Sequence, residues 1–153
     1  MQEGFDYNTL KSLTIFRELT KNEFDAVCKF IFIQKAAKDF FLFSQGMPGE
    51  LLYIIISGRV EIIKKAKNND KIVLATMGAN DIVGELSLID SEPRSATGRT
   101  TEDSVLLGIT KESFKSMLET DPRIAAKILM SLLKIMSKRL RTTTNQKIEG
   151  SNS

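Results

Sequence analysis

The sequence predicts a single, mainly β domain, in which a sandwich or barrel of strands has helices before and after it. Three observations lead to this prediction. Turn residues recur about every ten positions between residues 34 and 109 and separate short β-rich runs. No helical spacers lie between those runs, as a parallel sheet would require. Helical signals occupy the flanking segments, residues 1–33 and 110–144.

The N-terminal segment, residues 1–33, is predicted to be helical. Thr20 and Glu23 have the spacing of a capping box, in which each side chain binds the backbone amide of the other residue. Apolar residues then recur at helical spacing, at Phe24, Val27, Cys28 and Ile31. Cys28 lies on this apolar stripe and is interpreted as a small buried hydrophobe.

Residues 34–109 supply the strands of the predicted barrel. Clusters of Gly, Pro, Asn and Asp mark turns at 38–39, 46–49, 57–58, 68–70 and 78–81. The β-rich runs between and after these turns are 40–43, 52–56, 60–64, 72–77, 95–101 and 104–109.

Two helices are predicted in residues 110–144. Thr110 is a suitable N-cap for a helix over 111–119, and Asp121 followed by Pro122 marks a second helix start. An i, i+4 ladder then runs through Ile124, Ile128, Leu132, Met136 and Leu140. This helix is expected to reach Thr144 and to end in a frayed polar tail over residues 145–153.

Composition excludes several classes of function. The chain has no histidine and one cysteine, which excludes histidine-based catalysis and His- or Cys-rich metal sites. A cupin-type jelly-roll enzyme needs histidine ligands and is disfavoured on the same ground. The sequence has no apolar run long enough to span a membrane and no apolar signal segment at its N-terminus. A lone cysteine fits a reducing compartment, so a cytoplasmic location is expected.

The charge distribution leaves two interpretations open. The net charge is +3, and residues 127–148 carry basic side chains with no Asp or Glu among them. This run is either the solvated face of a helix or a surface for an acidic partner.

One segment, residues 82–97, does not follow the rhythm of strands and turns. Gly84 allows a sharp turn and the close approach of a ligand. Residues 85–89 can form one helical turn whose first amides bind an anion, and Arg94 offers a planar fork to two phosphate oxygens. Ser95 and Ala96 add a hydroxyl and two amides, while the Glu85 carboxylate can accept a hydrogen bond from a sugar hydroxyl. Phosphate and ribose groups side by side indicate a nucleotide.

The phosphate-binding cassette of cyclic nucleotide-binding domains closely resembles this segment, with Gly84-Glu85-Leu86-Ser87-Leu88 followed by Pro93-Arg94-Ser95-Ala96-Thr97. Such domains occur in the catabolite activator protein, in regulatory subunits of cAMP-dependent kinase and in gated channels. The resemblance continues upstream through Phe43-Ser44-Gln45-Gly46, Gly49, Leu52-Tyr53-Ile54-Ile55, Ser57-Gly58 and Val60, and it covers about residues 10–142.

The resemblance implies an eight-stranded jelly-roll barrel that binds a 3′,5′-cyclic nucleotide. It implies that Glu85 binds the ribose 2′-hydroxyl, and that Arg94 and nearby amides hold the cyclic phosphate. The ligand-binding set it implies is Gly84, Glu85, Leu86, Ser87, Arg94, Ser95 and Ala96. No catalytic residue, metal or cofactor is implied, because the ligand moves the C-terminal helix against the barrel and is not consumed.

Three positions depart from the family pattern. Asn80 stands in place of a turn glycine, Val83 where an aromatic residue is common, and Gly98 where a β-branched strand residue is expected. Asn80 tolerates positive φ, and Gly98 is expected to loosen the strand that follows the cassette.

The identity of the nucleotide and the residue that caps its base stay open at this point. Ser95 favours cAMP over cGMP, because cGMP-selective relatives often carry Thr there. The base is capped either by Thr143 and Thr144 or by Arg139. The alternative function is a domain of the same fold that has lost its ligand and docks other proteins.

The predicted partners follow from the C-terminal end of the chain. Nine residues after Thr144 leave no room for a helix-turn-helix, so no DNA-binding module is expected. The predicted partners are then the cyclic nucleotide itself, a second copy of the chain through the C-terminal helix, or a downstream effector domain, with no membrane partner.

Overall fold

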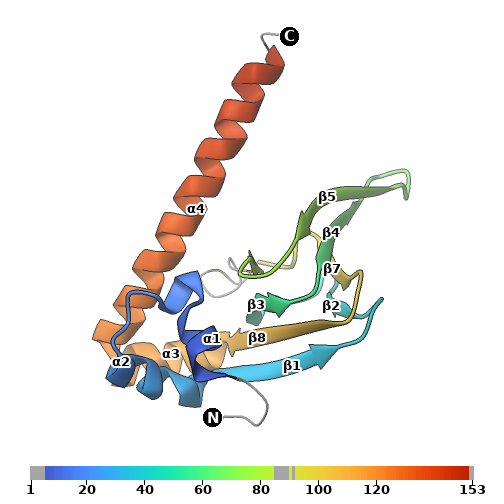
Figure 1. Cartoon of the computed structure of the whole chain (residues 1–153). Helices are drawn as coiled ribbons and strands as arrows, with labels where there is room; N and C mark the ends of the chain where they lie inside the picture. The colour runs from blue at the N-terminus through green and yellow to red at the C-terminus, as the bar shows by residue number, and fades with distance from the viewer. Residues whose placement is uncertain (1–5, 85–89, 91, 152–153) are drawn as a thin grey trace.

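A computed structural model of the chain describes residues 6–84, 90 and 92–151, with backbone alone from residue 144 (Figure 1). It confirms the jelly-roll fold predicted from the sequence, with two antiparallel sheets of four strands. One sheet has the order β1 (Phe32–Ala36), β8 (Ser104–Thr110), β3 (Leu51–Ser57) and β6 (Ile82–Val83). The other has the order β2 (Phe41–Phe43), β7 (Thr97–Thr100), β4 (Val60–Lys65) and β5 (Lys71–Met77).

Strand β3 is buried on both faces and joins two hydrophobic cores. Successive side chains of a strand point to opposite faces. Leu52 and Ile54 accordingly belong to a core shared with the helices, whereas Tyr53 and Ile55 belong to a second core inside the barrel. The β1-β8-β3-β6 sheet is therefore covered by helices on one side and by the second sheet on the other.

The N-terminal segment forms four short helical pieces that cover this sheet. They are α1 (Tyr7–Lys11), the 3₁₀ helix η1 (Thr14–Phe16), α2 (Lys21–Val27) and the 3₁₀ helix η2 (Cys28–Phe30). The predicted capping box is confirmed, because Thr20 Oγ1 accepts from the Glu23 amide and Glu23 accepts from the Thr20 amide. Cys28 is half-buried against the helical core, and burial raises the pKa of its thiol.

Two strands were missed by the sequence prediction. Strand β1 begins at Phe32, within the segment predicted to be helical, and pairs along its whole length with β8. The helical pattern of apolar residues ends at Ile31, and the tertiary pairing with β8 decides the conformation after it. The two-residue strand β6 lies inside the predicted cassette and pairs with Tyr53 and Ile54.

The C-terminal helices begin where the caps predict. Thr110 caps α3 (Lys111–Thr120) through its hydroxyl, and α4 (Pro122–Ser151) starts at the predicted proline. The expected end at Thr144 is wrong, since the helix continues to Ser151. The predicted tail is therefore helical as far as Ser151, and residues 152–153 lie outside the described residues. No proline interrupts that stretch, and its polar residues have helix propensities close to those of the preceding turn. Figure 1 shows the C-terminal end of α4 standing clear of the strands.

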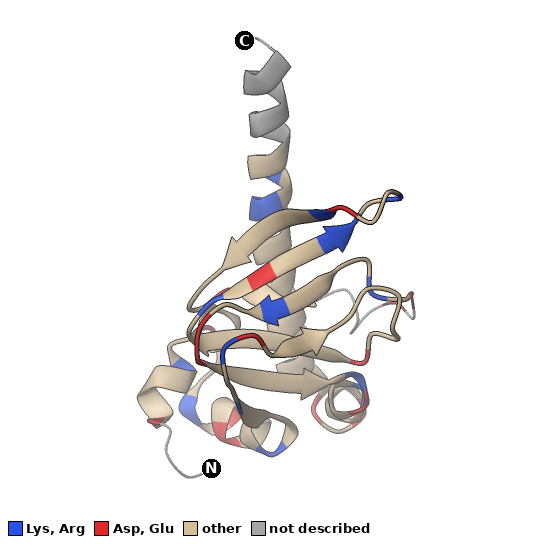
Figure 2. Ribbon diagram, turned by 90° about the vertical axis from the view of Figure 1, so that its right-hand side faces the viewer, with Lys and Arg blue, Asp and Glu red and all other residues tan. Residues whose placement is uncertain are grey.

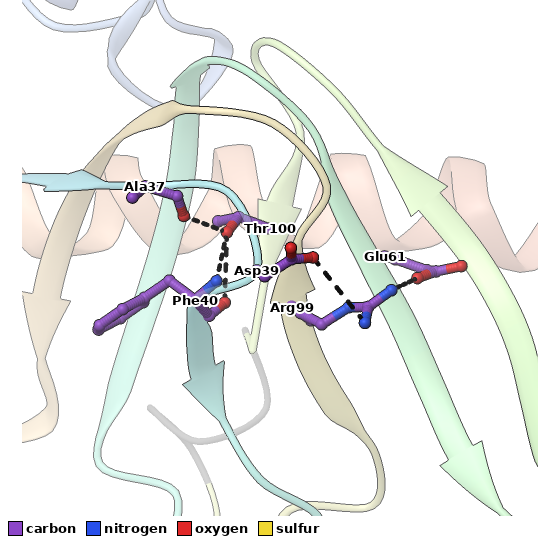
Figure 3. A network of polar contacts seen from close by, with 6 residues as sticks. All are labelled: Ala37, Asp39, Phe40, Glu61, Arg99 and Thr100. Carbon is purple, nitrogen blue, oxygen red and sulfur yellow. Dashed lines mark hydrogen bonds and ion pairs between the residues drawn. The ribbon is translucent and has the colours of Figure 1, made fainter.

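Polar contacts around Arg99 and Thr100 fix the start of β2 against β7 (Figure 3). The Arg99 guanidinium donates to Glu61 at 3.0 Å and lies 4.0 Å from Asp39. The Thr100 hydroxyl donates to the Ala37 carbonyl at 2.6 Å and accepts from the Phe40 amide at 2.8 Å. These contacts set the position of the short strand β2, which carries Phe43 toward the candidate site.

The basic run on α4 is partly used within the molecule. Figure 2 shows Lys and Arg on α4 and at the tip of the β4–β5 hairpin. Lys127 forms an ion pair with Glu23 at 2.7 Å, and Arg139 donates to the Ile82 carbonyl at 2.7 Å. Neither a purely solvated face nor a purely external docking surface therefore describes this helix.

The Glu23–Lys127 pair predicts a pH-dependent link between α2 and α4. The hydrogen bond from Lys127, aided by the Thr20 amide, lowers the pKa of Glu23. The pKa of the Glu23 carboxyl is lower in the folded protein than its ordinary value of about 4.3 in the unfolded chain. The ion pair therefore stabilises the fold above about pH 4.3, and this stabilisation is lost as the pH falls through the lowered pKa. We expect Lys127→Met to destabilise the protein at pH 7, with a smaller difference from wild type at pH 3, in urea unfolding.

The control is Lys134→Met, which removes an exposed lysine from the same helix. It should follow the wild-type pH profile. If Lys127→Met lowers the free energy of unfolding by the same amount at pH 7 and at pH 3, the assignment of the ion pair is wrong.

Candidate functional site

A cavity of about 900 Å³ lies between the barrel and α4. That volume is at the upper end of the range usual for small-molecule sites. Of the predicted site residues, the structure brings Gly84, Arg94, Ser95 and Ala96 together on its wall. Glu85, Leu86 and Ser87 lie outside the described residues, and so does the single helical turn predicted over residues 85–89. The binding roles of all seven residues stay predictions.

Gly84 allows the two sides of the site to approach closely. It follows β6 directly and has φ of +77°, in the left-handed region. A Cβ atom at this position would collide with Nη1 of Arg94 and would lie 3.2 Å from the Leu51 carbonyl oxygen. Any other residue at position 84 would therefore displace the Arg94 guanidinium.

Arg94 is held by backbone and side-chain contacts from several strands and loops. Its terminal nitrogens donate to the carbonyls of Leu51 at 2.5 Å and Gly84 at 3.3 Å. Its guanidinium carbon lies 4.4 Å from the centroid of the Phe43 ring, within the range of a cation–π interaction. Its backbone amide donates to Met47 and its carbonyl accepts from Gly46, each at 2.8 Å. The predicted turn at 46–49 therefore anchors Arg94.

The Arg94 charge acts on the interior of the barrel. Burial raises the pKa of the Tyr53 phenol, while the Arg94 charge lowers it by a smaller amount. The phenol donates to the Gln34 side chain at 3.2 Å. The cation therefore lies at the boundary between the open cavity and the barrel core, where an anion that binds it would be partly shielded from water.

Ser95 and Ala96 differ in how far they are accessible. Ser95 is exposed at the cavity wall, whereas Ala96 is buried at 8% relative exposure. Thr97 follows at the start of β7, where its hydroxyl accepts from the Gln45 amide at 2.9 Å. The end of the cassette is thus fixed by the same loop that anchors Arg94.

The wall opposite the barrel is formed by α4. Its contributions are Ile135, Lys138, Arg139, Thr142 and Thr143. Arg139 and Thr143, one from each of the two alternatives for capping the base, therefore both line the cavity. The side chain of Thr144 lies outside the described part of the structure. Sequence analysis did not assign Ile135, Lys138 or Thr142 to the site, because the barrel-facing side of α4 depends on the tertiary contact.

Asn80 ties the rim of the cavity to the N-terminal helices. It has φ of +72°, as expected for a residue in place of a turn glycine. Its side chain also accepts from the Thr14 amide at 2.9 Å and donates to the Thr14 hydroxyl at 2.6 Å. Thr14 lies in η1 and lines the cavity, and no sequence signal linked it to position 80.

Gly98, which was expected to loosen its strand, lies within the paired strand β7, and the loosening itself stays a prediction. It is buried in β7 and pairs with β2 on one side and β4 on the other. The Phe43 ring covers it, since a Cβ atom at Gly98 would lie 2.7 Å from the ring.

The described residues include no group of three or more Cys, Asp or Glu side chains placed to hold a metal ion. None of the helices in that part of the chain combines the length and apolar character that crossing a bilayer requires.

Comparison with known proteins gives the family. The family model described as the cyclic nucleotide-binding domain matches residues 33–121. The chain belongs to the cyclic nucleotide-binding domain family. This confirms the resemblance seen in the sequence, and the family is one of regulatory, typically non-enzymatic binding domains.

Similar proteins of this family include transcriptional regulators. A CRP-like cAMP-activated global transcriptional regulator of Mycobacterium tuberculosis is 35% identical over 68% of this chain and 45% of its own length. A cyclic AMP receptor protein of Thermus thermophilus is 27% identical over 86% of this chain and 59% of its own. The solved structure of a cyclic nucleotide-binding domain from Methylobacillus flagellatus KT has 27% identity and a TM-score of 0.82, and covers 91% of this chain and 82% of that chain.

The predicted set of partners is corrected by these matches. The sequence prediction excluded a DNA-binding module and named, beside the cyclic nucleotide, a second copy of the chain or a downstream effector domain as partners. One of the matched relatives is, however, a global transcriptional regulator, and the chain spans 45% of its length and 59% of the length of the cyclic AMP receptor protein. A short segment after the long helix is therefore no ground for excluding a role in transcription.

The Asn80–Thr14 contact predicts a graded effect of two substitutions. Asn80→Ala loses both hydrogen bonds and places a residue with Cβ in the left-handed region, so we expect it to lower the free energy of unfolding by about 2 kcal/mol. Asn80→Gly loses the hydrogen bonds but suits the turn, so we expect a loss of about 1 kcal/mol. Urea denaturation monitored by circular dichroism measures both.

Asn69→Ala is the matched control, because Asn69 also has positive φ, at 67°, in the hairpin between β4 and β5. It should cost less than Asn80→Ala. Equal losses at positions 69 and 80 would mean that the bonds to Thr14 contribute nothing.

Proposed function

We propose that the chain is a non-catalytic sensor that binds a 3′,5′-cyclic nucleotide, with cAMP preferred over cGMP, in the cavity between the barrel and α4. The observation that carries this proposal is the placement of the Arg94 guanidinium on the cavity wall, next to the left-handed turn at Gly84. A guanidinium presents several donors in one plane, so it can bind backbone carbonyls and phosphate oxygens together.

In this proposal the cyclic phosphate lies against Arg94 and the amides near Gly84, Leu86, Ser95 and Ala96. Glu85 binds the ribose 2′-hydroxyl, and Ser87 completes the cassette. For Glu85, Leu86 and Ser87 the proposal rests on the resemblance of the sequence to the family cassette. For Arg94 it also rests on the geometry of the cavity wall.

The preference for cAMP rests on two points. Ser95 stands where cGMP-selective relatives often carry Thr, and Ser95 is exposed at the cavity wall. The M. tuberculosis and T. thermophilus relatives are named as cAMP-activated and as a cyclic AMP receptor. The cytoplasmic location expected from the single cysteine is a separate prediction and does not bear on the choice of nucleotide.

The relay in this proposal runs through α4. A ligand biases only an element that it contacts differently in two states. Helix α4 lines the cavity from Ile135 to Thr143 and is bound to β6 through the Arg139–Ile82 hydrogen bond. A nucleotide in the cavity would contact that face of the helix directly.

The first test is calorimetric titration with cAMP and cGMP. We expect Arg94→Ala to weaken cAMP binding by about 2–5 kcal/mol, because a phosphate would lose its charged partner in a site partly closed to water. This loss is roughly 30- to 4,000-fold in affinity. The 2′-deoxy analogue of cAMP should bind the wild type more weakly than cAMP, as the Glu85 assignment requires.

Arg59→Ala is the control, since Arg59 is an exposed arginine in the turn between β3 and β4 and does not line the cavity. It should keep the wild-type affinity. A wild type that binds neither nucleotide at millimolar concentration supports the alternative, a domain of this fold that docks other proteins. Binding by Arg94→Ala within threefold of wild type would mean that the cassette assignment is wrong.

The relay predicts a change in amide hydrogen exchange on α4 when cAMP binds. We expect altered protection in the segment from Ile135 to Thr143, because its side chains line the cavity. The strands β1 and β8, which lie away from the cavity wall, serve as the internal control. Unchanged protection along α4 at saturating cAMP, with binding shown by calorimetry, would refute the relay.

A further inference from the structure

Three groups from two strands and a loop meet beside the cavity. Phe43 at the end of β2 lies directly opposite Gly98 of β7 in the sheet. A Cβ atom built on Gly98 would lie 2.7, 2.8 and 3.2 Å from three atoms of the Phe43 ring. The Arg94 guanidinium carbon lies 4.4 Å from the centroid of the same ring. Gly98 and Arg94 therefore both contact the Phe43 ring.

The Phe43 ring can occupy this position because Gly98 has no side chain. Gly98 is buried between two neighbouring strands, so its backbone cannot retreat from a side chain above it. An aromatic ring laid over a glycine on the adjacent strand is a known way of stabilising glycine within a sheet. The departure of Gly98 from the family pattern and the position of Phe43 thus have one common explanation.

The ring and the carbonyls restrict the guanidinium in different directions. The ring supports its face, while Leu51 and Gly84 accept hydrogen bonds at its edge. An arginine side chain otherwise samples many rotamers, and ordering it on binding weakens the affinity. A guanidinium that is already oriented avoids most of that loss.

We propose that Phe43, seated on Gly98, is a positioning residue that holds the Arg94 guanidinium in the orientation required for a phosphate. This inference rests on the proposed function, because it concerns the phosphate end of the same ligand. Phe43 also lines the cavity, and the role proposed for it here is exerted through Arg94.

The variant that tests it is Phe43→Leu, which keeps an apolar side chain in the barrel but removes the aromatic face. We expect cAMP affinity to fall roughly 3- to 30-fold, the range that corresponds to a partly desolvated cation–π contact. The relaxation of the Arg94 Nε–H group, measured by ¹⁵N NMR without ligand, should show greater side-chain mobility. Gly98→Ala should act in the same direction by displacing the ring.

Phe41→Leu is the matched control, since Phe41 lies on the same strand, is 54% exposed and does not line the cavity. It should leave both the affinity and the Arg94 mobility unchanged. Weaker binding by Phe43→Leu together with a more mobile Arg94, in a variant that melts cooperatively, supports the inference.

Two results would overturn the inference alone. One is Phe43→Leu affinity within twofold of a wild type that binds cAMP. The other is a loss of affinity with unchanged Arg94 mobility, which would indicate general repacking of the barrel. A wild type that binds no cyclic nucleotide would instead overturn the proposed function, and the inference with it.

Discussion

The close approach between Gly84 and Arg94 is the constraint on which the rest of the site depends. The guanidinium reaches two backbone carbonyls because position 84 carries no Cβ. It lies against the Phe43 ring because position 98 carries none either. Two absent side chains thus make room for one large cation. A partly buried guanidinium needs polar and aromatic partners in place of the water it has lost, and these contacts supply such partners.

Strand β3 links this cation to the helical layer. The Leu51 carbonyl at the start of the strand accepts a hydrogen bond from Arg94. The side chains that follow along the strand pack alternately into the helical core and into the barrel core. Leu52 packs with the helices, whereas Tyr53 packs inside the barrel beside Gln34. Because protein cores are close-packed, a shift of the strand end toward or away from Arg94 is resisted on both faces.

Features governed by local sequence were predictable, and features governed by distant contacts were not. The Thr20–Glu23 capping box, the Thr110 cap of α3 and the start of α4 at Pro122 depend on residues a few positions apart, and all three are confirmed. Gly84, Arg94, Ser95 and Ala96 were grouped by sequence alone, and they do share one cavity. Strand β1, the Asn80–Thr14 bonds and the ring over Gly98 depend on partners more than 50 residues away. No local pattern encodes such pairings, so the sequence could indicate the departures at Asn80 and Gly98 but not their consequences.

The two residues of β6 contact the barrel core and α4, and they directly precede Gly84 of the candidate site. The Ile82 side chain lies in the helical core and its carbonyl accepts from Arg139 of α4. Val83 lies in the barrel core, and the next carbonyl, that of Gly84, accepts from Arg94. Arg94 and Arg139 therefore hold backbone carbonyls only two residues apart, although they come from a loop and from a distant helix. Packed cores tend to switch between discrete arrangements and do not deform continuously. A displacement of either arginine therefore acts directly on the backbone at or next to β6.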